Sequence, residues 1–307
     1  MHRTKQNAIN SKMTHTRHIL VTLALLAAVT LSAWAAGVTN EAFSINSPGD
    51  SWVLHDLTAS MRSIGSGATI THYGSDQKAM ELVGITCLDG AFDPAEYIDR
   101  QVMRRQDIFA KAASNLSAVT DTVFLRYPAK IIHFTKQQGS GKFLCSALAF
   151  NVGFSTFYIV QGHDTAINPY TTTLLQSLKI NTDTARLTSA ASYVKAIAKV
   201  LKRHNLTIGR NEYLSAVSMP DSSTVAFSVT IPYLSHDNVV TDAFVASKRA
   251  DFLKALPTAY GFNLFTRAII DQKLTFRYVY VDTKGKEIAT MTLTPADYSY
   301  LKFSKTK

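Results

Sequence analysis

The chain contains little cysteine, with only 2 among its 307 residues. A scaffold held together by many disulfides and a cysteine-rich zinc array are therefore excluded. No phosphate-binding loop, dinucleotide fingerprint or esterase nucleophile elbow occurs either, so the sequence points to no cofactor and no metal. With 46% hydrophobic and 18% charged residues, the chain is too apolar for a disordered tail. We expect one large or two modest globular cores.

The N-terminus has the pattern of a secretory signal peptide. Residues 1–18 contain no acidic residue and four basic ones, Arg3, Lys5, Lys12 and Arg17. An apolar run follows over 19–33 and ends at Ala33-Trp34-Ala35, where the small side chains at 33 and 35 suit a signal peptidase. We therefore predict a signal peptide over 1–35, cleaved after Ala35. Met13 is an alternative start, because the signal is already complete from there.

Export also sets the expected surroundings of the mature chain. No cysteine follows the apolar run at a lipidation position, and no second long apolar run exists. We expect a periplasmic or secreted protein without stable membrane insertion. Removing residues 1–35 leaves 28 basic against 22 acidic residues, a formal charge of +6. Export and this modest charge argue against a nucleic-acid partner.

The two cysteines leave two alternatives open. Cys87 and Cys145 both fall in apolar, strand-like runs. In an oxidising compartment they can pair, and a loop of this length would contribute about 4 kcal/mol to stability. The alternative is that both are buried thiols that pack as small hydrophobic side chains.

Residues 36–181 form the first predicted domain. Apolar runs bounded by turn residues predict strands over 41–45, 52–57, 68–73, 80–88, 119–126, 129–135, 142–151 and 154–161. Between them, Asp93-Pro94 opens a helix, in which Asp93 caps the first turn and Phe92 packs on Tyr97. A closing helix passes through Leu174, Leu175 and Leu178. We therefore predict an α+β fold with antiparallel sheets and helices packed on them.

Residues 182–187 look like a polar linker, and 188–307 form a second predicted α+β domain. Helices are expected over 189–204, over 242–256 with a stop at Pro257, and over 264–271. Strands are expected over 213–219, 224–231, 274–281 and 288–294. Residues 224–231 alternate strictly between apolar and small or polar side chains, which predicts one buried face and one wet or thinly covered face.

The first domain resembles the Mog1/PsbP-like superfamily. The resemblance covers about residues 40–180 and rests on Phe43-Ser44-Ile45-Asn46-Ser47-Pro48 with Trp52 soon after, on the order of elements, and on the closing segment at 174–180. It implies an α/β/α sandwich around an antiparallel sheet. It also implies a role in binding or assisting partners, since the superfamily has no shared catalytic residues. No functional residue carries over.

The second domain resembles small α+β domains of unknown function from secreted bacterial proteins. The resemblance rests on the segment TFRYVYVDTKGKEIATMTLTPADY over 275–298. It implies no activity.

One candidate binding surface is a basic helix face. Lys195, Lys199 and Lys202 recur at helical spacing beside Arg203, in a stretch from 184 to 211 that has no acidic residue. Such a face can meet anionic lipid, polysaccharide or another anionic envelope surface. The alternative is a solvated helix face opposite the buried stripe.

A second candidate is an aromatic ridge. Phe276, Tyr278 and Tyr280 lie on one face of the strand predicted over 274–281. If this face is exposed, it suits a glycan or peptide ligand; if the preceding helices cover it, it belongs to the core.

Three His-Asp pairs are the candidates for catalysis: His55-Asp56, His163-Asp164 and His236-Asp237. A metallohydrolase uses such residues to bind metal and activate water, but these pairs lie at strand ends or in loops. His72 and His133 lie in predicted strands that can bring them together. Our leading hypothesis is a non-catalytic binding or assembly module with an envelope protein or glycan as partner, and a His-Asp hydrolase is the alternative.

Overall fold

The computed structural model describes residues 37–63, 70–76, 81–104, 110, 113–138, 141–163, 174–203, 205–209, 211–235 and 241–301. The predicted signal peptide lies outside these residues. Within them, no helix is both long enough and apolar enough to cross a membrane. We call residues 36–181 the N-terminal part and residues 188–307 the C-terminal part.

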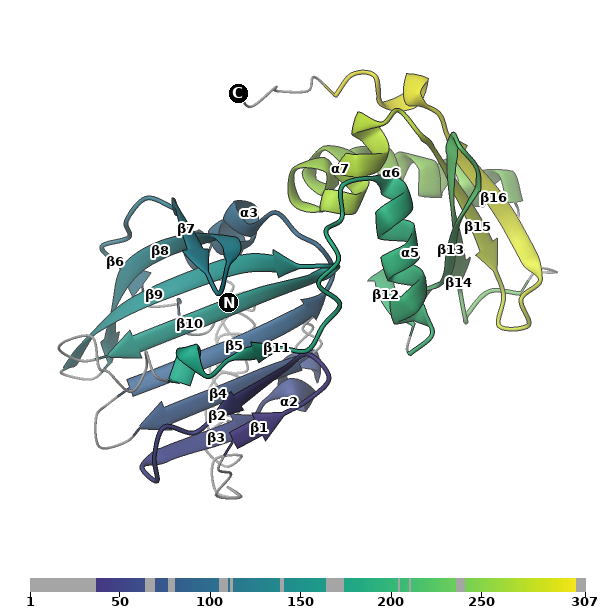
Figure 1. Cartoon of the computed structure of the whole chain (residues 1–307). Helices are drawn as coiled ribbons and strands as arrows, with labels where there is room; N and C mark the ends of the chain where they lie inside the picture. The colour runs from purple at the N-terminus through teal and green to yellow at the C-terminus, as the bar shows by residue number, and fades with distance from the viewer. Residues whose placement is uncertain are drawn as a thin grey trace, which may run out of the picture.

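The N-terminal part is built on an eight-stranded sheet of order β3-β4-β5-β10-β9-β8-β6, with β7 also paired to β8 (Figure 1). Every pairing in this sheet is antiparallel, as the sequence predicts. The strands are β3 (Trp52–Asp56), β4 (Ile70–Asp76), β5 (Glu81–Asp89), β6 (Ala113–Ser114), β7 (Thr120–Phe124), β8 (Tyr127–Gln138), β9 (Gly141–Val152) and β10 (Ser155–His163).

Both faces of this sheet are covered. On one face, helix α3 (Pro94–Ile98) and the π-helical turn η1 (Asp99–Met103) bury Ile98 and Val102 in a core cluster. On the other face, a small sheet of β1 (Gly37–Thr39), β2 (Phe43–Asn46) and β11 (Lys179–Ile180) buries Phe43, together with Leu174 and Leu178. The short helix α2 (Thr58–Ser63) connects β3 to β4.

The start of α3 follows the sequence prediction. The Asp93 side chain accepts hydrogen bonds from the backbone N–H groups of Ala95 and Glu96, and Pro94 occupies the first turn. The rings of Phe92 and Tyr97 stack with their centroids 6.1 Å apart. Local capping residues therefore fix where this helix begins.

The C-terminal part is built on a five-stranded sheet of order β12-β13-β14-β15-β16. Its strands are β12 (Leu206–Gly209), β13 (Glu212–Asp221), β14 (Thr224–Thr230), β15 (Thr275–Val281) and β16 (Glu287–Leu293), and its helices are α5 (Ala190–Leu201), α6 (Thr241–Phe262) and α7 (Leu264–Asp271), followed by the 3₁₀ turn η3 (Pro295–Tyr298). The expectation of purely antiparallel sheets is wrong at one place. Strands β14 and β15 pair in parallel, because the α6–α7 segment between them forms a crossover. The α+β class itself is confirmed.

The predicted stop of a helix at Pro257 is wrong. Helix α6 continues through Pro257 to Phe262. A proline lacks the N–H that would bond the carbonyl four residues earlier, which here is that of Leu253. The Tyr300 hydroxyl donates to that carbonyl at 3.0 Å. A side chain from beyond η3 thus supplies the missing donor, which the local sequence does not reveal.

Candidate functional site

The predicted basic face of α5 is engaged within the molecule. Lys199 Nζ lies 2.5 Å from the Asp183 carboxylate, and this hydrogen bond lowers the pKa of Asp183. Arg203 Nη1 lies 3.3 Å from the carboxylate of Glu41, in the N-terminal part. Lys195 and Lys202 are exposed. Two of the four basic side chains therefore face acidic groups of this chain.

The predicted linker and the residue before it, Asn181, contact the N-terminal part. The Asn181 backbone N–H donates to the Ala42 carbonyl at 2.8 Å. Gly153, in the turn between β9 and β10, has φ +57°, and a Cβ there would lie 2.0 Å from the Asp183 carbonyl oxygen. Only glycine fits this approach, because it has no Cβ and tolerates positive φ. The linker thus packs on the N-terminal part.

The aromatic ridge is part of the core, so its prediction as a binding surface is wrong. Phe276 and Tyr280 are only 1% and 5% exposed. Phe252 and Phe244 of α6 pack on them, with ring centroids 5.4 and 5.1 Å away. Burial raises the pKa of Tyr278. The crossover helices cover this face because apolar area is removed from water there.

The alternative of a Cys87–Cys145 disulfide is wrong, since both cysteines are buried and neither forms a disulfide. Cys87 is opposite Phe157 of β10, and Cys145 is opposite Gly162 of the same strand. Positions 157 and 162 face opposite sides of the sheet, and the two thiols belong to different core clusters. Burial is the main cause that raises the pKa of Cys87.

The fold does not bring the described histidines together in one site. His72 lies in β4 and His133 in β8, with β5, β10 and β9 between them, so the expectation that they approach each other is wrong. Asp56 Oδ1 lies 3.8 Å from His72 Nε2, and burial lowers the pKa of both His55 and His72. In the described chain, no three His, Cys, Asp or Glu side chains form a group that could hold a metal. Asp164, His236 and Asp237 lie outside the described residues.

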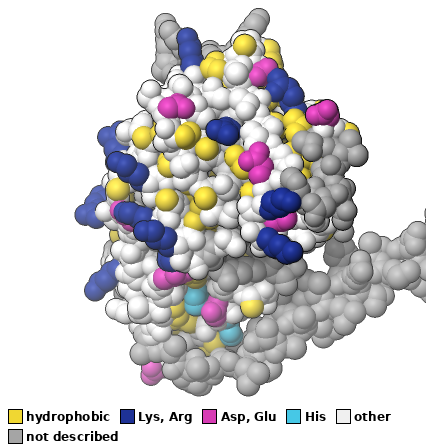
Figure 2. Space-filling view, turned by 90° about the vertical axis from the view of Figure 1, so that its right-hand side faces the viewer, with side chains coloured by type: hydrophobic (Ala, Val, Ile, Leu, Met, Phe, Trp, Pro, Cys, Tyr) yellow, Lys and Arg dark blue, Asp and Glu magenta, His cyan; other side chains and the backbone are white. Residues whose placement is uncertain are grey.

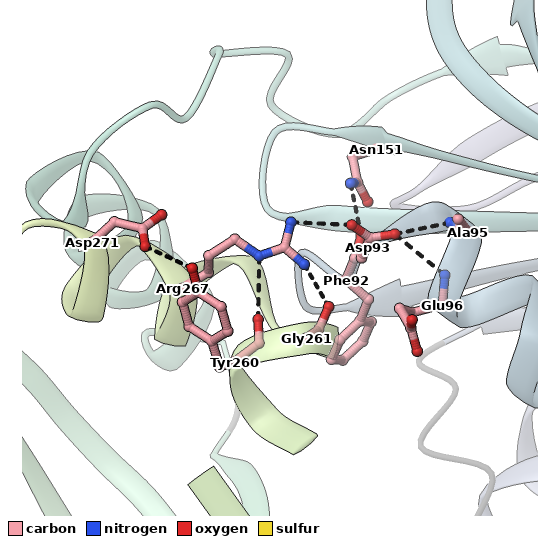
Figure 3. Close-up of polar contacts among 9 residues, drawn as sticks. All are labelled: Phe92, Asp93, Ala95, Glu96, Asn151, Tyr260, Gly261, Arg267 and Asp271. Atoms are coloured by element: carbon pink, nitrogen blue, oxygen red, sulfur yellow. Dashed lines mark hydrogen bonds and ion pairs between the residues drawn. The ribbon is translucent and has the colours of Figure 1, made fainter. Parts of the chain in front are cut away.

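An ion pair joins the two parts at the start of α3 (Figure 3). Arg267 Nη1 of α7 donates to Asp93 Oδ2 at 3.1 Å. The same guanidinium donates to the carbonyls of Tyr260 and Gly261, at the end of α6. Asp93 therefore has two roles, since its other carboxylate oxygen caps α3.

Aromatic and backbone contacts complete this junction. Phe92 and Phe262 stack with centroids 4.6 Å apart, and the Arg100 guanidinium lies 3.6 Å from the Phe262 ring centroid. The Asp93 N–H donates to the Phe262 carbonyl at 2.8 Å. Asn151 Nδ2 donates to the Phe92 carbonyl, which ties the junction to β9. An ion pair, a pair of stacked rings and a backbone hydrogen bond therefore connect the two parts at this junction.

The five-stranded sheet has one covered and one uncovered face. Val225, Phe227 and Val229 of β14 point to the core that α5, α6 and α7 cover. In Figure 1 the helices lie on one side of this sheet, and the other side faces outward. No described element packs on that side, so it matches the thinly covered face that the alternation over 224–231 predicts.

The strand register arranges the uncovered face in rows. The central row contains Ser218, Ala226, Arg277 and Thr292. The row beside it contains Ala216, Ser228, Val279 and Thr290. Figure 2 looks at this side of the molecule, where few charged side chains interrupt the middle of the upper part and Lys and Arg gather along its left margin. Small hydroxyl and aliphatic side chains thus form a flat surface around one arginine.

The sequence did not predict the Asp93–Arg267 ion pair or the position of Arg277 on the uncovered face. Arg267 and Asp93 are 174 residues apart, so no local pattern could have paired them. Arg277 has a weak signal, since it is the one charged residue in the run over 274–281 and alternates with the aromatic ridge.

Comparisons with known proteins give structural neighbours only. No family model matches the chain, and no curated protein matches it. A Pseudomonas aeruginosa protein assigned as secreted is 10% identical, with a TM-score of 0.27 over 35% of this chain and 91% of that one. The type II secretion system pilotin AspS from Vibrio cholerae is 15% identical, with a TM-score of 0.26 over 35% and 87%. A Bacteroides thetaiotaomicron protein is 10% identical, with a TM-score of 0.32 over 56% and 62%. These TM-scores carry no argument about function, and the Mog1/PsbP-like resemblance stays a hypothesis.

Proposed function

We propose that this protein is an exported, non-catalytic binding module of the cell envelope. It would consist of a signal peptide over 1–35, a domain over 36–181, a linker over 182–187 and a second domain over 188–307. The uncovered face of the five-stranded sheet is its recognition surface, and a macromolecule of the envelope is its partner.

The observation that carries this proposal is the unequal covering of the second sheet. A sheet in a globular domain has each face either packed against the core or exposed to water, and an exposed face ordinarily bears polar side chains. Here Ala216, Ala226, Ser228 and Val279 are small, so another surface can approach the backbone closely. Arginine is enriched at protein interfaces, and the small neighbours of Arg277 leave its guanidinium open to a partner.

The contacts between the two parts support a fixed orientation of that surface. The Asp93–Arg267 pair, the Phe92–Phe262 stack and the Glu41–Arg203 pair join residues from both parts. A partner held at the sheet face would therefore be held at a set position relative to the eight-stranded sheet.

Site-specific photo-crosslinking in the native envelope tests this proposal. A benzophenone side chain is introduced at Ser218 or Thr292 on the uncovered face, both exposed, or as a control at the exposed Thr120 of β7. We expect discrete crosslinked species from the two face positions and none from Thr120. Crosslinks from Thr120 alone, or from no position, would overturn the proposal.

A further inference from the structure

The centre of the uncovered face holds an arginine, Arg277, for which the described residues supply no partner. The Arg277 side chain is exposed and makes no hydrogen bond, ion pair or ring contact with a described residue. Six other described arginines each contact a carboxylate or an aromatic ring: Arg100, Arg104, Arg126, Arg203, Arg249 and Arg267. Arg186 in the linker is also exposed and without such a contact. Arg277 differs from it by standing in the middle of a sheet.

The surroundings of Arg277 leave its guanidinium accessible and uncompensated. Its neighbours in the row, Ala226 and Thr292, are too small to cover it. The acidic residues on this side are engaged locally. Asp221 accepts hydrogen bonds from the N–H and the hydroxyl of Ser223, and Glu287 accepts one from Thr290. Neither of these two described carboxylates forms an ion pair with Arg277.

The C-terminal part as a whole carries a net positive charge, the same sign as that of Arg277. Residues 182–307 contain 17 Lys and Arg against 10 Asp and Glu, whereas residues 36–181 contain 11 against 12. The positive charge of the mature chain thus belongs to the part that bears the uncovered face. An anionic partner is steered to that part by the long-range field and is held by a short-range pair with Arg277.

The side chains favour a protein as the source of the anionic group. The strand register places one aromatic side chain on this face, that of Tyr213, in the row with Thr230 and Val281 that lies two rows away from Arg277. No ring in the described rows therefore lies beside the guanidinium to stack on a sugar bound there. Val279 offers apolar contact one row from the guanidinium, and arginine is among the residues enriched at protein interfaces. A second copy of this chain in a face-to-face dimer would oppose two unpaired arginines near the axis.

We propose that the uncovered face docks an acidic protein surface, with Arg277 forming a bidentate pair with one of its Asp or Glu carboxylates. This inference rests on the proposed function and names the class of partner. A guanidinium suits the role because its planar fork donates two parallel hydrogen bonds to a carboxylate. The hydroxyls of Thr275, Thr290 and Thr292 surround the pair and can bond neighbouring polar groups of the partner.

Binding of poly-L-glutamate, a polypeptide that carries only carboxylates, tests the inference on the mature chain. We expect salt-sensitive binding that Arg277→Glu weakens about tenfold or more. Arg277→Lys should recover only part of the affinity, because an ammonium lacks the bidentate fork. Arg186→Glu is the matched control, since it makes the same charge change at an exposed, unpaired arginine away from the sheet, and its affinity should stay within about twofold of the parent.

Each of the following outcomes would overturn the inference. The first is that the Arg277→Glu and Arg186→Glu variants bind poly-L-glutamate equally, or that the mature chain does not bind it at all. The second is that amide shifts of the labelled protein on titration map to Lys195 and Lys202 on α5 rather than to β14, β15 and β16. The third is that polygalacturonate or phosphatidylglycerol vesicles bind more tightly through Arg277, which would assign the face to an acidic glycan or a lipid surface. Crosslinking from Ser218 that is insensitive to Arg277→Glu would keep the proposed function and reject this inference alone.

Discussion

The two sheets of this protein differ in how they are covered. The eight-stranded sheet carries α3 and η1 on one face and a small sheet on the other, with a separate core cluster on each side. The five-stranded sheet carries all of its described helices on one face and has a single core cluster. A sheet covered on both faces buries both of its surfaces, whereas a sheet covered on one face leaves the other accessible. Under the proposed function, the first sheet would serve as support and the second as the recognition surface.

The largest effect should come from the covered face of β15. Phe276→Ala removes a ring that is 1% exposed and that contacts Phe252 and Tyr298. We expect a loss of about 3–5 kcal/mol in the free energy of unfolding, because the cavity adds to the lost burial. Urea unfolding followed by circular dichroism measures it.

The uncovered face of the same strand provides the control. Val279 is half-buried there, and Val279→Ala should cost less than about 1 kcal/mol, because less apolar area is lost. Equal losses at positions 276 and 279 would mean that both faces are covered, and the comparison between the sheets would fail.

The junction should give the next largest effect. Arg267→Ala leaves Asp93 without its cation and the Gly261 carbonyl without its donor. We expect the free energy of unfolding to fall by about 1–3 kcal/mol. Trp52 is the single tryptophan after residue 35 and reports on the N-terminal part, so its fluorescence transition should separate from the far-ultraviolet transition.

Tyr260→Phe is the matched control for the junction. It removes a hydroxyl that donates to Asp271 within the C-terminal part and leaves the contacts between the parts intact. In Tyr260→Phe we expect the fluorescence and far-ultraviolet transitions to coincide. If they also coincide in Arg267→Ala, the two parts unfold together without the Asp93–Arg267 pair.

The sequence predicted what depends on neighbouring residues. The capped start of α3, the bounds of α7 and the alternation of β14 follow from residues within a few positions of one another. It failed where distant residues decide the outcome. Tyr300 lets α6 pass Pro257, α6 covers Phe276, and Asp183 and Glu41 engage the basic residues of α5. The alternation predicted an uncovered face, but only the register shows which side chains share a row with Arg277.

Acid should destabilise the N-terminal part through His72, a smaller effect than loss of the junction. Burial lowers the pKa of His72 in the folded state below its ordinary value of 6.5, and Asp56 offsets this only in part. The unfolded chain therefore binds the proton more readily, so stability is complete above about pH 6.5 and falls as the pH drops toward the folded pKa. The described histidines all lie in the N-terminal part, so Trp52 fluorescence should report the change.

Replacement by a side chain that cannot be protonated checks the assignment to His72. His72→Gln should flatten the decline in stability below pH 6.5 without abolishing it, because burial also lowers the pKa of His55. Replacement of His133, which is exposed in β8, should leave the decline as it is. An unchanged slope in His72→Gln would assign the acid sensitivity to another group.

The smallest effect should come from the ion pairs of α5. The Lys199–Asp183 and Arg203–Glu41 pairs are about half exposed, so each contributes about 0.2–1 kcal/mol and weakens with salt. Lys199→Ala should therefore reduce stability slightly at low salt and not at high salt, while Lys195→Ala, which breaks no described pair, should change it at neither. If Lys199→Ala instead leaves stability unchanged and abolishes salt-sensitive binding to anionic vesicles, α5 is the recognition surface. The division of roles between the uncovered sheet and the rest of the molecule would then have to be redrawn around that helix.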